Sequence, residues 1–317
     1  MSALTRRHLL RLLPAAALCS CGDEPASSGA PMPKVKWLTT STTPFTANMV
    51  AVIGGDAVDS RCFLPQGVSP YGFAPGAPDL AKFDTSDIVF AHGLGLENKW
   101  AVDFAALDKS GVRVFTVTDT IPPDRIIRPS GPGGPPDPHV WTDPALAALM
   151  VDAVEAALKT AIPKLADYFT PRAYSLRLQF QDAVAYNTEK LRALQPKDRF
   201  LLSTHDTLQY LAKACGLEAK ALSPANGTVP EALTDELSTW IRSHGVRSLF
   251  RERSTEILPL RKLLRELSVD PDHVIYSLAL GAPEAFESVS IRNYNVDTAA
   301  GAIRYTCDSI IATLEVD

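Results

Sequence analysis

The sequence predicts an α/β protein with two lobes of parallel β-sheet and helices, joined by a single long α-helix. At 317 residues and 46% hydrophobic, the chain is long enough and apolar enough for two domains with buried cores. Short apolar runs typical of buried strands alternate with helical patterns in both halves of the chain. One long helical pattern lies between the two series, so we expect a linking helix there.

The first residues have the layout of an export signal. Arg6, Arg7 and Arg11 precede the apolar run 12–18, which is shorter than the roughly 20 residues needed to cross a bilayer. The segment around Cys21 resembles a bacterial lipobox, so Cys21 is the expected lipid anchor, and the adjacent arginines leave Sec and twin-arginine export both open. The small, polar, proline-bearing residues that follow predict a flexible tether.

The expected organisation has five parts. They are a signal peptide (1–20), a flexible tether (21–33), an N-terminal α/β lobe (34–169), a linking helix (170–195) and a C-terminal α/β lobe (196–317).

Strand patterns in the N-terminal lobe occupy residues 34–40, 87–90 and 112–117. Asp143 is a good N-cap and Pro144 a good first residue for a helix that runs to about Ala161. The preceding segment 121–138 is rich in proline and glycine, which predicts a surface loop that leads into this helix.

The linking helix is expected between Pro171 and Leu194, where apolar residues recur at helical spacing without glycine or internal proline. Pro196 ends the pattern. A second strand series follows at residues 199–203, 246–250 and 273–276, which predicts the second parallel sheet.

Charge and cysteine content limit the functions to consider. The net charge is −5, and loss of the three leader arginines makes the mature chain more acidic still, which argues against nucleic-acid binding. Cys62, Cys215 and Cys307 remain in the mature chain, and in an oxidising compartment we expect one disulfide and one buried thiol, with the pair left open.

Two of the six histidines have contexts typical of metal ligands. His139 lies between prolines at a loop-to-helix junction, and His205 follows the strand pattern 199–203, where α/β sheets place ligands. His92, His244 and His273 are better explained as structural residues at a glycine loop, a helix end and a strand entry.

Three motifs taken together resemble the zinc/manganese family of ABC-transporter solute-binding proteins. Residues 137–144 (DPHVWTDP) match the motif of the family's second histidine ligand, and residues 203–206 with 210–213 match that of its third ligand. Residues 86–97 match the strand and loop after its first ligand. The resemblance runs from about Val35 to the C-terminus, and it implies a ligand cleft between the lobes.

Two expected ligands of that family are replaced. Tyr71 stands where the first histidine is expected, and Leu278, which cannot coordinate, stands where an aspartate is expected. The loop before the second motif also lacks the histidines that the family often carries there. Tyr71, Glu252 and Asp206 are the candidates for additional ligands, although Asp206 is better explained as a residue that orients His205.

The resemblance therefore implies an exported, lipid-anchored monomer that is not an enzyme. It would bind a transition-metal ion in the cleft through His139 and His205 and deliver it to an ABC permease. Zinc is the expected ion, because imidazole at the third position favours it over manganese, but manganese and iron remain open. One alternative is a cleft repurposed for a metal chelate or a small organic ligand. A more remote alternative is a zinc-dependent hydrolase, for which the sequence offers no His-x-x-x-His pair.

Overall fold

The structure is a computed structural model that describes residues 36–224, 230, 232–252, 255 and 257–315. The expected signal peptide (1–20), the lipid anchor Cys21 and the tether (21–33) lie outside the described residues. Of the helices that are described, none combines the length and the hydrophobicity that crossing a bilayer requires.

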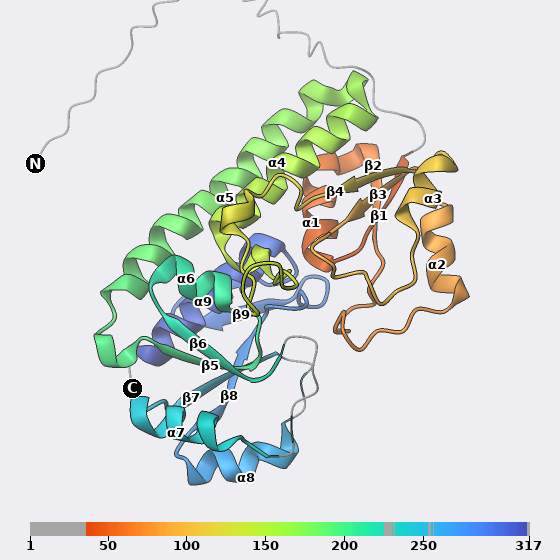
Figure 1. The fold of residues 1–317 in the computed structure, drawn as a ribbon. Coiled ribbons are helices and arrows are strands. Elements are labelled where there is room, and N and C mark those ends of the chain that lie inside the picture. Colours follow the sequence, from red (N-terminus) through yellow and green to blue (C-terminus); the bar gives the residue numbers. More distant parts are fainter. Residues whose placement is uncertain (1–35, 225–229, 231, 253–254, 256, 316–317) are drawn as a thin grey trace, which may run out of the picture.

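The N-terminal lobe is built on a parallel sheet of four strands in the order β2-β1-β3-β4 (Figure 1). The strands are β1 (Trp37–Ser41), β2 (Val58–Cys62), β3 (Ile88–Ala91) and β4 (Arg113–Thr116). Its helices are α1 (Pro44–Gly54), α2 (Ala77–Asp84) and α3 (Phe104–Lys109), with short 3-10 helices at Gly55–Ala57, Pro123–Arg125 and Val140–Thr142.

The C-terminal lobe repeats this arrangement with a parallel sheet in the order β6-β5-β7-β8. The strands are β5 (Phe200–His205), β6 (Glu218–Ser223), β7 (Ser248–Glu252) and β8 (Asp270–Ile275). The helices are α6 (Gln209–Cys215), α7 (Asp235–His244), α8 (Leu258–Glu266) and α9 (Ala299–Leu314), and an antiparallel hairpin joins β9 (Phe286–Val289) to β10 (Arg292–Asn295).

Two long helices lie side by side along the molecule, as Figure 1 shows. Helix α4 (Pro144–Ala161) begins and ends as expected, and the carboxylate of Asp143 caps it by accepting a hydrogen bond from the Ala145 N–H at 2.8 Å. Helix α5 (Ala166–Ala193) is the linking helix, and it contacts α1 of one lobe and α6 and α9 of the other. The predicted fold class, two parallel-sheet lobes joined by one long helix, is confirmed.

The start of α5 differs from expectation. The helix begins at Ala166, five residues before the expected start at Pro171, so Pro171 lies inside it. Pro171 removes only the hydrogen bond to the carbonyl four residues earlier, near the helix start, and packing of α5 against α1, α4 and α9 outweighs that loss.

The main hydrophobic core runs through both lobes. Phe45 from the N-terminal lobe, Phe180 from α5 and Tyr276 from the C-terminal lobe belong to one buried cluster. Smaller clusters lie beneath α7 and α8 in one lobe and around Phe63 in the other. Because the largest core crosses the lobe boundary, the relative position of the lobes is fixed by packing.

The expected disulfide is absent, because Cys62, Cys215 and Cys307 are all free thiols. Cys215 and Cys307 are buried, and burial raises the pKa of Cys215 to about 11 and also raises that of Cys307. These two side chains therefore behave as small apolar groups.

Candidate functional site

The best-defined feature of the cleft is a fully buried imidazole held by a carboxylate. His139 precedes the 3-10 helix Val140–Thr142, and its Nδ1 lies 2.6 Å from Oδ1 of Asp137. The same oxygen accepts a hydrogen bond from the backbone N–H of His139 at 2.9 Å. Because the carboxylate can only accept, Nδ1 carries the proton and Nε2 keeps its lone pair. This is how proteins orient a histidine that binds a metal ion.

Tyr71 faces the lone pair of that imidazole. Its hydroxyl lies 2.8 Å from Nε2 of His139 and donates the hydrogen bond. Burial raises the pKa of the Tyr71 hydroxyl, and the negative charges of Asp137 and Asp206 raise it further. The phenol therefore stays neutral at ordinary pH. A cation can reach Nε2 of His139 only by displacing the hydroxyl proton of Tyr71.

His92, which the sequence indicated as structural, supports the loop that carries His139. Its Nε2 donates to the carbonyl of Pro138 at 2.7 Å, directly before His139 in the chain. Burial lowers the pKa of His92 to about 3, so the ring is neutral. The backbone N–H of His92 is in turn held by Thr42 and Glu97.

Trp141 connects this loop to the other lobe. Its indole N–H donates to the carbonyl of Ser277 at 2.8 Å, and its ring stacks on Phe45 and meets the edge of the His139 ring. The Ser277 hydroxyl contacts that of Thr207 at 2.6 Å, next to the end of β5. The three loops that carry the predicted ligands therefore adjoin one another.

Glu252 accepts hydrogen bonds from the backbone, which is a different role from that of a metal ligand. It is buried at the end of β7, and its carboxylate accepts hydrogen bonds from the backbone N–H groups of Ser277 and Leu278 at 3.1–3.2 Å and from the Ser277 hydroxyl. Both carboxylate oxygens are used in this way. Glu252 thus fixes the backbone at Leu278, whose side chain is itself buried.

The third motif lies where the sequence placed it. His205 is the last residue of β5, and Asp206 follows it. The carboxylate of Asp206 accepts from Gln209 Nε2 at 2.6 Å, and burial raises its pKa. The charges of Asp137 and His139 also influence that pKa, so Asp206 shares a neighbourhood with them.

A cavity of about 340 Å³ opens beside Tyr71, and His139 and His205 are not among the described residues that line it. Tyr71, Asp137 and Asp206 contribute its polar wall. Oδ2 of Asp137 is buried there without a hydrogen-bond partner. Five prolines contribute much of the remaining wall, namely Pro129, Pro135, Pro136, Pro138 and Pro224. Among its described lining residues there are two carboxylates and no lysine or arginine, so the cavity favours a cation.

The structure brings together some of the predicted site residues. Tyr71 contacts His139, and Asp206 lies near both. Over the residues that the structure describes, however, no three histidine, cysteine, aspartate or glutamate side chains converge on one point suited to a metal ion. His244 and His273 lie elsewhere, against Phe200 and Phe250 respectively.

Sequence reasoning missed the supporting roles of Asp137 and His92. Asp137 stands two residues before His139, a spacing that could have suggested the contact. His92 gave no local signal, because its partner Pro138 is 46 residues away in the chain.

Comparison with known proteins agrees with this architecture. The family model described as zinc-uptake complex component A, periplasmic, matches residues 39–301. The manganese-binding lipoprotein MntA of Bacillus subtilis is 26% identical over 300 residues, which cover 91% of this chain and 95% of that protein. The zinc-binding protein TroA of Treponema pallidum is 27% identical over 283 residues, which cover 88% and 89%.

Solved structures show the same fold. The periplasmic zinc-binding protein TroA superposes with a TM-score of 0.75 at 26% identity, covering 88% of this chain and 99% of TroA. A Mn-bound periplasmic metal-binding protein from Candidatus Liberibacter asiaticus reaches a TM-score of 0.76 at 22% identity, covering 88% and 100%.

Proposed function

The chain belongs to the family of zinc-uptake complex component A, periplasmic, and from this membership and the cleft we propose that it captures Zn²⁺ and delivers it to the permease of an ABC importer. The matched relatives are solute-binding proteins, so the expectation that the chain is not an enzyme is confirmed. No bond is made or broken in capture; the protein only has to hold the ion and release it.

One observation carries the proposal. The Asp137 carboxylate fixes the proton of His139 on Nδ1 and leaves Nε2 directed at Tyr71 in the cleft. A buried imidazole oriented in this way can bind a metal ion once the Tyr71 hydroxyl gives up its hydrogen bond to Nε2. His205, at the adjoining end of β5, supplies the second nitrogen, and the oxygen of Tyr71 is the third donor.

Nitrogen donors support zinc as the ion. The named relatives include both a manganese-binding and a zinc-binding protein, so the relatives alone leave the ion open. Two imidazoles favour the later divalent ions over manganese, which prefers carboxylate oxygens. With fewer than four protein donors, water completes the coordination, and we expect weaker binding than at a closed four-ligand site.

The same proposal includes a lipid anchor in the membrane and a permease as the transport partner. Cys21 would carry the lipid, and the acidic tether of small residues after it would let the two lobes reach the permease outside the cytoplasm. Glu252, the second of the three candidates for additional ligands, serves in this proposal by fixing the backbone at Leu278.

The proposal predicts the effect of removing each imidazole. Zinc titrated calorimetrically into chelator-treated protein should bind at one site, and His139→Ala and His205→Ala should each weaken that binding by roughly 100-fold or more. His244→Ala is the matched control, because that ring packs on Phe200 and Trp240 outside the cleft. Zinc binding that survives both cleft substitutions would exclude this site.

The cavity favours a second candidate, a metal chelate or a small organic cation. Its volume of about 340 Å³ is larger than a bare ion needs, and its wall is rich in proline. The unpartnered Oδ2 of Asp137 is an acceptor for such a ligand. If Zn²⁺, Mn²⁺ and Fe³⁺ all fail to bind alone, native mass spectrometry of protein purified from its host should reveal an organic ligand that Asp137→Asn releases.

A further inference from the structure

The turn that carries His139 is held at two neighbouring carbonyl groups, one by each lobe. His92 of the N-terminal lobe donates to the carbonyl of Pro138 at 2.7 Å. Tyr210, on α6 of the C-terminal lobe, donates its hydroxyl hydrogen to the carbonyl of Asp137, also at 2.7 Å. His139 follows these two residues directly in the chain, so its backbone is fixed relative to both lobes.

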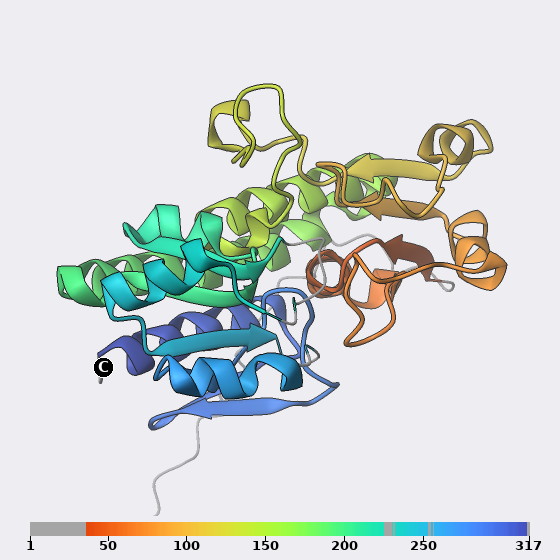
Figure 2. The same cartoon turned by 60° about the horizontal axis from the view of Figure 1, so that its bottom comes forward.

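The Tyr210 hydroxyl also closes the base of the loop between Ile127 and Asp137. It accepts a hydrogen bond from the N–H of Ile127 at 3.0 Å, and the N–H of Asp137 donates to the carbonyl of Ile127 at 2.8 Å. Figure 2 shows this loop, in yellow, projecting from the molecule. Because the N–H and the C=O of Asp137 are both bonded at this base, the position of Asp137 depends on the Tyr210 hydroxyl.

Asp137 transmits this restraint to the imidazole of His139. Its Oδ1 lies 2.6 Å from Nδ1 of His139 and accepts a hydrogen bond from the backbone N–H of the same residue at 2.9 Å. A shift of Asp137 therefore turns the ring and redirects Nε2. Tyr210 can act on the metal site in this way without contacting an ion.

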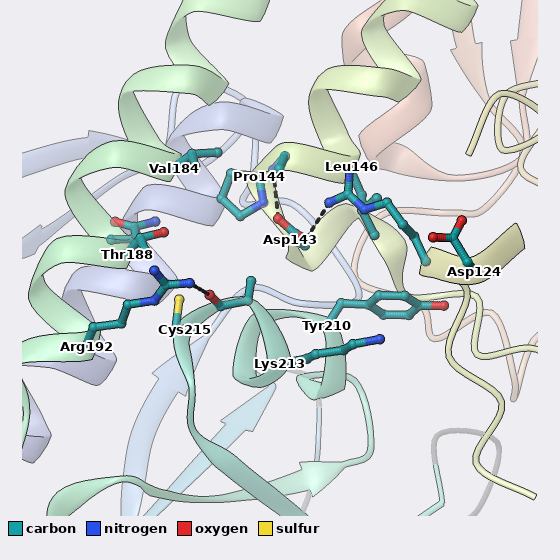
Figure 3. Close-up of a pocket in the computed structure, with 14 residues that line it drawn as sticks. Asp124, Asp143, Pro144, Leu146, Val184, Thr188, Arg192, Tyr210, Lys213 and Cys215 are labelled. Carbon is teal, nitrogen blue, oxygen red and sulfur yellow. Dashed lines mark hydrogen bonds and ion pairs between the residues drawn. The ribbon is translucent and has the colours of Figure 1, made fainter. Parts of the chain in front are cut away.

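Tyr210 belongs to the same chain segment as the other proposed ligand. Strand β5 ends at His205 and helix α6 begins at Gln209, so Tyr210 lies five residues after His205. Figure 3 shows the Tyr210 ring pointing away from α6. The side chain is 2% exposed and belongs to the core cluster that both lobes share. Tyr210 therefore connects the segment of His205 with the turn of His139.

We propose that Tyr210 is a positioning residue that sets the place of the His139 imidazole relative to His205. The inference rests on the metal capture proposed above. Without the hydroxyl, the carbonyl of Asp137 and the N–H of Ile127 lose a shared partner, and this tie between the turn and the C-terminal lobe is gone. Zinc then has to order the imidazole as it binds, which weakens its binding.

Tyr210→Phe tests the proposal, because it keeps the ring and removes only the hydroxyl. In calorimetric titrations of the chelator-treated full chain, this variant should bind Zn²⁺ about 10-fold more weakly than the wild type. Tyr168→Phe is the matched control, because the Tyr168 hydroxyl also accepts a backbone N–H, that of Asp56 at 3.1 Å, near the start of α5. The control should keep the wild-type affinity. Unchanged zinc affinity in Tyr210→Phe overturns the proposal.

Two further measurements separate positioning from a general loss of stability. In a His139→Ala background, Tyr210→Phe should not weaken zinc binding further, because Tyr210 acts through His139. The visible absorption of Co²⁺ bound in place of Zn²⁺ reports the geometry of the ligands, so Tyr210→Phe should change that spectrum and Tyr168→Phe should not. An equal loss of zinc affinity in both backgrounds, or an unchanged Co²⁺ spectrum in Tyr210→Phe, overturns the positioning role.

The same titrations distinguish failure of this inference from failure of the capture site. If His139→Ala weakens zinc binding and Tyr210→Phe does not, only the role of Tyr210 is overturned. If His139→Ala leaves zinc binding unchanged, the capture site is wrong and the inference falls with it.

Discussion

Replacing Tyr71 by histidine and Leu278 by aspartate in one chain is expected to raise the zinc affinity of the cleft by roughly 100-fold or more, because the two changes complete a four-donor site. The Tyr71 hydroxyl lies 2.8 Å from Nε2 of His139, on the side from which an ion would bind. An imidazole is shorter than a phenol, so Tyr71→His exposes a second nitrogen and leaves room for an ion between the two rings.

The backbone at Leu278 is already fixed for this exchange. Its N–H donates to Glu252 at 3.2 Å, and its side chain is buried beside the loop of Trp141. Leu278→Asp alone places an unpaired carboxylate in that position and should lower the free energy of unfolding in the absence of metal. In the double variant, zinc should restore the free energy of unfolding, because an ion that binds only the folded state stabilises that state.

Calorimetric titration with zinc and thermal unfolding with and without zinc provide the measurements. Tyr174→His is the matched control, because Tyr174 is 57% exposed on α5 and its exchange adds an imidazole away from the cleft. A double variant whose zinc affinity equals that of the wild type would show that His139 and position 71 do not share an ion.

The sequence predicted the central strands of both sheets and the edge strands β4 and β8, but it missed the edge strands β2 and β6. The pattern at residues 87–90 lies on β3 and that at 199–203 on β5, two strands buried on both faces that read as continuous apolar runs. Strands β2 and β6 lie at sheet edges and carry polar residues such as Asp59 and Lys220, so no strand pattern stood out there. Edge strands are stabilised by pairing more than by their own composition.

The residues of the site likewise divide into those that the sequence predicted and those that it did not. His139 and His205 were predicted as ligands because each stands in a local motif, and in the structure Tyr71 contacts His139. The roles of His92 and Glu252 depend on partners 46 and 25 residues away in the chain. Only the folded chain brings such groups together, so no spacing rule could have assigned them.

The stability of the protein should fall between pH 4.5 and pH 7 because of one buried carboxyl group. Burial raises the pKa of Glu252 from 4.5 to about 7, although the hydrogen bonds from Ser277 and Leu278 act in the opposite direction. In this range the folded protein keeps a proton that the unfolded chain has lost. The contribution of Glu252 is thus fully present below pH 4.5, and it declines by roughly 3 kcal/mol as the pH rises through 7.

Glu252→Gln isolates this contribution, since an amide does not ionise. The variant lacks one acceptor for the N–H groups of Ser277 and Leu278, so it should be less stable than the wild type at pH 4.5. The deficit should shrink by pH 8, where the wild type carries the buried charge. Urea unfolding of chelator-treated protein measures both free energies, with Glu236→Gln as the control, because the Glu236 side chain is 85% exposed. A deficit that stays constant with pH would mean that Glu252 ionises in the folded protein as it does in the unfolded chain, and that its role at Leu278 is one of hydrogen bonding alone.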